Sequence, residues 1–164
     1  MTRRSGRVLL GIVAASALIS LLSFLLVAID VAVEGGWTMQ ITGTDLQGGP
    51  GTDLVDSHTS AVDQVWLAVS GTTGPGDSWQ ITVSRTEALW HAELTVQIRR
   101  TGDGIGGSLS GGTDFQVVGA AGALLFSGED DIADIPLQLR VSGLSVQIPP
   151  AAYATTITLT VVDL

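Results

Sequence analysis

The residues best suited to bind a ligand are three aspartates in and beside a glycine-rich stretch, Asp45, Asp53 and Asp56. Calcium ions take carboxylate and loop carbonyl oxygens, so this group is a candidate Ca²⁺ site. Residues 48–56 also fit the nonapeptide of calcium-binding β-rolls, but those folds share each ion between stacked repeats and this chain holds one copy. The alternative is that these carboxylates are solvated loop residues. The same two readings apply to a second acidic group, Glu129, Asp130, Asp131 and Asp134.

Catalysis is not indicated by the remaining polar residues. A Ser or Thr nucleophile needs a histidine in reach and a third group that orients it. The only histidines are His58 and His91, and the run Asp56-Ser57-His58 lies in a predicted loop, where sequence neighbours rarely form a triad. Absence of Cys removes thiolate nucleophiles and Cys-based zinc sites. We therefore expect a protein that is not an enzyme and has no cofactor, with Ca²⁺ as the one candidate ion.

Three glycines, Gly102, Gly104 and Gly107, satisfy the pattern G-x-G-x-x-G after a predicted strand. In a dinucleotide site this pattern opens a helix whose N-terminus meets the pyrophosphate. Here more glycine-rich sequence follows, in residues 108–114, and no helix is predicted. The pattern therefore indicates a flexible connection between strands.

Four tryptophans offer a further binding surface, because indole rings stack on sugars when they are exposed. Trp37 and Trp79 lie on the apolar faces of their predicted strands, so we expect both in the core. Trp66 and Trp90 do not lie on such an apolar face and are the candidates for a glycan platform.

An apolar leader, residues 8–29, precedes all of these residues and follows Arg3, Arg4 and Arg7. As a helix its 22 residues extend about 33 Å, enough to cross a hydrocarbon core of about 30 Å. Poor cleavage sites favour a retained membrane anchor over a cleaved signal peptide, and both alternatives stay open. Either way the arginines stay in the cytoplasm and the remainder faces outward, at the cell membrane or, after cleavage, in secreted form.

Charge limits the partners of the outward part. From Asp30 onward the chain has sixteen acidic residues against four arginines and no lysine, a formal charge of −12. Such a surface repels phosphate backbones, so we expect no nucleic acid partner. The expected partners are the membrane, through the leader, and other surface proteins or further copies of this chain.

Short segments of alternating apolar and polar residues fill the region after the leader, and no amphipathic helical window interrupts them. They predict an all-β fold, an antiparallel immunoglobulin-like β-sandwich of about eight strands after one N-terminal transmembrane or signal helix. The expected organisation is a signal peptide or anchor over residues 1–29, a linker over 30–36 and one extracytoplasmic domain over 37–164. Within it, the strands are expected at residues 37–42, 65–69, 79–84, 94–99, 115–118, 124–127, 135–141, 144–148 and 153–161. The second and third of these should form a hairpin, residues 101–114 a loop and residues 128–131 an acidic turn.

The end of the chain carries a family resemblance. Ile148-Pro149-Pro150-Ala151-Ala152-Tyr153 leads into a Thr- and Val-rich strand. This ending resembles that of spore coat protein U and related fimbrial subunits, where a Pro/Gly turn and a Tyr precede the final strand. The resemblance implies an extracellular immunoglobulin-like subunit that accepts a strand from a neighbour or donates one to it.

These observations predict a non-enzymatic, extracytoplasmic β-sandwich with a structural or assembly role at the cell surface, such as a surface or filament subunit. The alternative is a ligand-binding ectodomain for glycan or Ca²⁺ that is held at the membrane.

Overall fold

The computed structural model describes residues 28–164. The predicted leader lies almost entirely outside these residues, and within them no helix has the length and apolarity to span a membrane. The described part is all-β, as predicted, and every strand pair is antiparallel. Its elements are β1 (Asp30–Gly35), the 3₁₀ turn η1 (Gly43–Asp45), β2 (Ser57–Thr59), β3 (Val65–Ser70), β4 (Ser78–Leu89), β5 (Thr95–Arg100), β6 (Ile105–Ser110), β7 (Gln116–Val117), β8 (Ala123–Ser142) and β9 (Ala154–Asp163).

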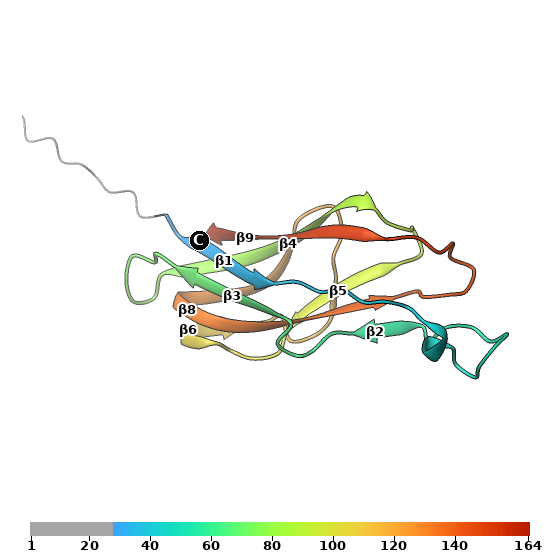
Figure 1. Cartoon of the computed structure of the whole chain (residues 1–164). Helices are drawn as coiled ribbons and strands as arrows, with labels where there is room; N and C mark the ends of the chain where they lie inside the picture. Colours follow the sequence, from blue (N-terminus) through green and yellow to red (C-terminus); the bar gives the residue numbers. More distant parts are fainter. Residues whose placement is uncertain (1–27) are drawn as a thin grey trace, which may run out of the picture.

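Strand β8 organises the sheet, because it pairs with β2, β3, β4, β5 and β6 (Figure 1). Its first part lies beside β4 as far as Glu129, and its second part lies beside β3 from Ile132 onward. Asp130, between these two parts, and Asp134, within the second part, have positive φ, 64° and 54°, a conformation that marks a local irregularity in a strand. The predicted acidic turn is thus a bend inside one long strand.

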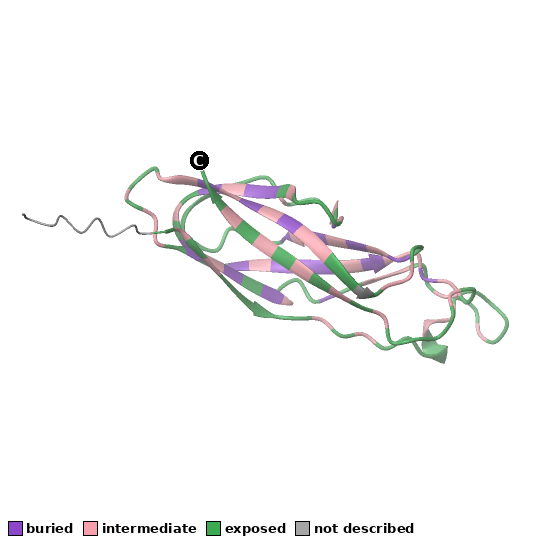
Figure 2. Ribbon diagram, turned by 90° about the horizontal axis from the view of Figure 1, so that it is seen from above, coloured by how far each residue is buried: buried purple, intermediate pink, exposed green. Residues whose placement is uncertain are grey.

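The core lies between the two parts of the folded sheet. Buried side chains alternate with exposed ones along the strands (Figure 2), as the period of two requires. Trp79 and Phe126 are the largest fully buried residues and meet edge to face, with ring centroids 6.3 Å apart. Predicted apolar faces of β3, β4 and β5 all point into this core.

Glycine-rich residues 105–110 form strand β6, where a flexible loop was predicted. A Cβ atom on Gly107 would lie 1.8 Å from the carbonyl oxygen of Glu129, and one on Gly106 would lie 2.2 Å from that of Asp131. Glycine therefore lets β6 approach the bend of β8 more closely than any other residue allows. The G-x-G-x-x-G pattern has a packing role here.

Four other predictions of local structure are corrected. Residues 30–35 form β1, paired with β3, although a linker was predicted over 30–36. Residues 37–42 pair with no strand, and residues 144–148 form a turn. The expected hairpin between β3 and β4 is absent from the described residues, because each of these strands pairs with β8 instead. Alternation of side chains sets the faces of a strand but not its neighbours.

The two ends of the strand order are β1 and β9, and they lie close to each other without a ladder between them in the described part of the chain. Figure 1 shows that they diverge toward the end of the molecule that holds η1. The fold is therefore one antiparallel sheet of nine strands that bends back on itself and stays open along one seam.

Candidate functional site

An apolar groove of about 980 Å³ occupies this seam. Its floor consists of inward side chains from β5 and the second part of β8, including Val96 and Val141. One wall is residues 36–41, which continue β1, and the other is the first half of β9. The side chains that stand along the two walls are Trp37, Met39, Ile41, Tyr153, Ile157 and Leu159.

Both walls are extended segments with unsatisfied edges. Trp37 and Met39 are half-buried while Thr38 and Gln40 are exposed, so residues 36–41 alternate as a strand does. No backbone hydrogen bond joins residues 37–41 to another described segment. Strand β9 pairs with β4 along one edge, and its other edge has no partner among residues 28–164. Two open strand edges therefore face each other across the groove.

No charged side chain lines the groove, which is notable in a domain with sixteen acidic residues. The lining consists of aliphatic and aromatic side chains, prolines, small residues and a few uncharged polar groups. Concave sites that are lined mostly by apolar side chains are typical of binding sites in proteins. The groove therefore suits an apolar, uncharged, extended segment.

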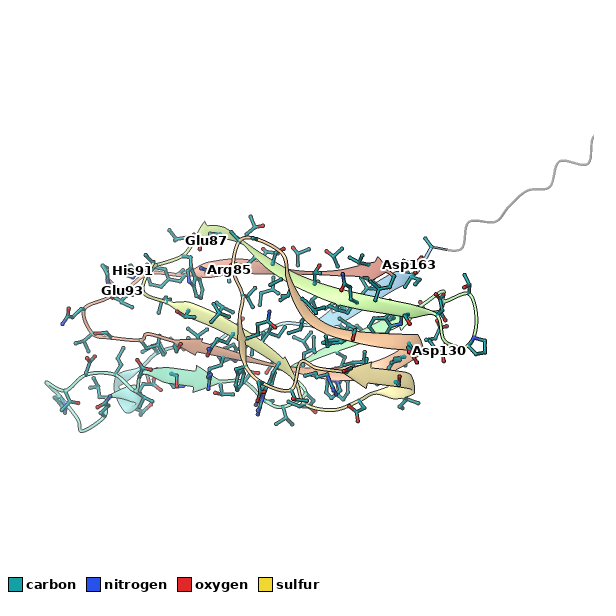
Figure 3. The ribbon with its side chains drawn as sticks, turned by 180° about the vertical axis from the view of Figure 1, so that it is seen from behind. Arg85, Glu87, His91, Glu93, Asp130 and Asp163 are labelled. Atoms are coloured by element: carbon teal, nitrogen blue, oxygen red, sulfur yellow. The ribbon has the colours of Figure 1, made fainter. Side chains whose placement is uncertain are left out.

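Arg85, Glu87 and His91 lie near one another at the β4–β5 connection (Figure 3), next to residues that line the groove. The His91 ring meets Tyr153 edge to face at 6.0 Å, and the Tyr153 hydroxyl donates to the carbonyl oxygen of Pro149 at 2.6 Å. The Arg85 guanidinium lies 5.7 Å from the Trp90 ring centre and pairs with Glu87 at 2.9 Å. These contacts hold Tyr153 and Trp90, two of the residues that line the groove, in place.

The three aspartates of the predicted Ca²⁺ site are not brought together. Asp45 caps η1, where its Oδ2 accepts from the Thr42 backbone N–H at 2.6 Å and its Oδ1 lies 3.2 Å from His58 Nε2. Asp53 Oδ1 accepts from the backbone N–H groups of Leu54 and Val146, and the side chain of Asp56 is exposed. Within residues 28–164, no three His, Cys, Asp or Glu side chains are grouped to hold a metal ion.

These hydrogen bonds shift the titration of the carboxylates. The Thr42 backbone N–H, aided by the Thr42 hydroxyl and His58, holds the pKa of Asp45 below its usual range. The N–H groups of Val146 and Leu54 lower the pKa of Asp53 in the same way. Both aspartates therefore act as loop-fixing acceptors.

Asp130 and Asp131 of the second acidic group and the two histidines serve local structure as well. Asp131 Oδ1 accepts from the backbone N–H and the hydroxyl of Thr72, and this lowers the pKa of Asp131. Asp130 Oδ1 accepts from the Gly76 backbone N–H. No Ser or Thr hydroxyl is hydrogen-bonded to His58 or His91 in the described region.

The tryptophans divide partly as predicted. Trp79 is fully buried, and Trp66 is 39% exposed. Trp90 is half-buried and donates its indole N–H to the carbonyl oxygen of Leu94 at 2.7 Å, while Trp37 forms a wall of the groove instead of core. The two tryptophans predicted as one platform thus lie at separate sites.

Comparison of the chain with protein-family models, with curated proteins and with solved structures finds no match. The site is therefore described by its geometry alone. The sequence contained one signal for the groove, the alternating residues 37–41 and 153–161, but nothing in it showed that these two segments would be left unpaired.

Proposed function

We propose that this chain is a non-enzymatic, extracytoplasmic subunit with a structural or assembly role at the cell surface. In this role the groove takes up an extended segment of a neighbouring copy. The observation that carries the proposal is the pair of open strand edges, β9 and residues 36–41, on either side of an uncharged apolar floor. An inserted strand gains main-chain hydrogen bonds from the edges and places alternate side chains on the floor.

Two further points belong to the same proposal. The sheet is an immunoglobulin-like sandwich in which β8 contributes to both layers, a view supported by the antiparallel order and the bend at Asp130–Asp134. The leader holds the domain at the outer face of a membrane, or is cleaved to release it, a view supported by the length and apolarity of residues 8–29.

A second copy is the proposed occupant because the chain supplies the matching chemistry. Residues 144–162 form an uninterrupted uncharged stretch with alternating Ile, Leu, Val and Thr, and the open edge of β9 within it can pair with an open edge of a neighbouring copy while β9 stays paired with β4. The remainder of the surface is strongly acidic, so contacts between copies elsewhere are opposed by charge repulsion. Association is therefore directed to the uncharged seam.

The experiment compares two neighbouring positions on β9. The side chain of Ile157 lines the groove, whereas that of Thr158 is exposed on the other face. We expect the full chain, purified from the cells that produce it, to form concentration-dependent oligomers in sedimentation velocity. Ile157→Glu places a charge in the groove and should leave monomers, while Thr158→Glu should assemble as the original chain does.

Two results would contradict the proposal. One is a chain that stays monomeric at concentrations of several hundred micromolar. The other is assembly that Ile157→Glu and Thr158→Glu affect equally, because the contact would then lie outside the groove.

A further inference from the structure

The arginines of the described region fall into two classes. Arg85 pairs with Glu87, and Arg100 pairs with Asp103. Arg99 and Arg140 have no carboxylate within 4.0 Å in residues 28–164. In a domain with four arginines and sixteen acidic residues, two cations without an acidic partner require an explanation.

These two arginines converge on one aromatic ring. The guanidinium carbons of Arg140 and Arg99 lie 4.0 Å and 4.5 Å from the ring centre of Phe115. Their positions are fixed from below by amides on the neighbouring strand. Gln138 Oε1 accepts from Nε and Nη2 of Arg99 at 2.9 and 2.8 Å, and Gln97 Oε1 accepts from Nε of Arg140 at 2.6 Å.

The remaining donors are available to a ligand. Nη1 of Arg99 and both Nη groups of Arg140 donate to no atom of the described chain, and none of them is buried. Two guanidinium groups on one ring repel each other, and an anion placed between them removes that cost. Arginine forks held in a fixed position match the two oxygens of a carboxylate.

Arg99 also lines a neighbouring surface depression of about 680 Å³. The exposed ring of Trp66 lies in this depression, together with the polar side chains of Asp63, Asp103, Thr101 and Thr113. An exposed indole beside hydroxyl and carboxylate groups offers a stacking face and hydrogen bonds to a sugar. The indole face of Trp66 stacks on a sugar ring but not on a glutamate side chain, which favours a saccharide as the source of the carboxylate.

We infer that Arg99, Phe115 and Arg140 form a binding site for the carboxylate of an acidic saccharide, with the sugar ring extending over Trp66. This site lies outside the groove, and its existence does not depend on the proposed assembly. It assigns a role to the one region of the described surface where cationic groups are gathered without acidic partners.

The test is titration calorimetry on the full chain with three probes. They are a disaccharide that ends in glucuronate, the matching disaccharide that ends in glucose, and a tetraglutamate peptide. We expect binding of the glucuronate probe, at least tenfold weaker binding of the neutral probe, and no binding of the peptide. Arg140→Gln, Arg99→Gln and Trp66→Ala should each weaken glucuronate binding at least tenfold.

Arg85→Gln is the matched control, because it also removes an arginine that lies against an aromatic ring, that of Trp90. It should leave binding unchanged. If Arg140→Gln does not fold, as judged by circular dichroism, Arg140→Lys keeps the charge and loses the fork, and should still weaken binding. Absence of glucuronate binding, equal binding of the neutral sugar or of the peptide, or unchanged binding by the arginine variants would overturn the inference.

Discussion

The indole ring of Trp79 lies directly on Gly128, its partner across the β4–β8 ladder. A Cβ atom at Gly128 would stand 2.5 Å from Cη2 and Cζ2 of the ring, and 2.8 Å from Leu109 Cδ2 on the opposite side. Trp79 Nε1 also donates to the carbonyl oxygen of Asp130 at 2.9 Å. The largest core residue is thus tied to the bend of β8, and the missing side chain at Gly128 makes the contact possible.

Gly128→Ala tests this contact. The added methyl group has no space between Trp79 and Leu109, so we expect the free energy of unfolding to fall by about 1–3 kcal/mol. Urea denaturation followed by tryptophan fluorescence measures the change. Gly122→Ala is the control, because no atom lies within 4 Å of its Cβ position, and it should unfold as the original chain does. Equal stability of the two variants would show that Trp79 is not packed as described.

Gly107→Ala tests the approach of β6 to β8. The new Cβ atom meets a backbone oxygen, that of Glu129, which moves less readily than a side chain. We therefore expect a loss of about 3 kcal/mol or more, larger than that of Gly128→Ala. Gly119→Ala, which meets no atom within 4 Å, serves as the control. A neutral Gly107→Ala variant would mean that residues 105–110 form the loop that the sequence suggested.

Gln138→Leu tests a buried polar link beneath Arg99. The Gln138 side chain is buried, donates to the Ser60 carbonyl oxygen at 2.9 Å and accepts from the Arg99 guanidinium. Its removal leaves a buried carbonyl without a donor, so we expect a loss of about 1–3 kcal/mol in thermal or urea unfolding. Gln147→Leu changes an exposed glutamine whose side chain makes no hydrogen bond to the described chain, and it should be close to neutral.

Asp53 gives a prediction about pH. The backbone N–H groups of Val146 and Leu54 lower its pKa in the folded chain, whereas in the unfolded chain the carboxyl returns to its ordinary value near 3.8. The unfolded chain therefore takes up the proton first as the pH falls, and the stability that Asp53 contributes is present above this value and lost below it.

We expect unfolding midpoints to fall as the pH is lowered from about 5 through the folded pKa, and Asp53→Asn to remove part of this dependence. Asp114→Asn is the control, since its carboxylate accepts no hydrogen bond from the described residues. If Asp53→Asn and the original chain lose stability in parallel across this range, the Val146 contact does not form in solution.

Calcium gives a prediction from the same loop. Asp45 and Asp53 already accept backbone N–H groups, and they are not grouped with Asp56 around a common point. A concentration of 1 mM Ca²⁺ is on the order of the dissociation constants of the weakest extracellular calcium sites. We expect the thermal unfolding midpoint in 1 mM Ca²⁺ to equal that in 1 mM Mg²⁺. A selective increase with Ca²⁺ would restore the calcium hypothesis.

The sequence by itself determined the fold class and the inward faces of the strands. Trp79, Ile81 and Val83 were predicted on one face of a strand and all are buried, because a period of two separates the faces of any strand. The same reasoning predicted a final strand over residues 153–161, which corresponds to β9, and predicted that Trp66 lies at the surface.

Only the tertiary structure decided which strands are neighbours. The alternation of apolar and polar residues is the same whether β3 pairs with β4 or with β8. A glycine-rich segment such as β6 is predicted to be a loop, because the sequence does not show that another strand packs closely against it. It also decided that residues 36–41 and β9 stay unpaired and that Phe115 meets Arg99 and Arg140 from a different part of the chain. Both candidate sites consist of residues that are far apart in the sequence. Strand pairing and the proximity of such side chains depend on long-range packing, which no local sequence pattern encodes. For this reason the sequence alone did not predict either site.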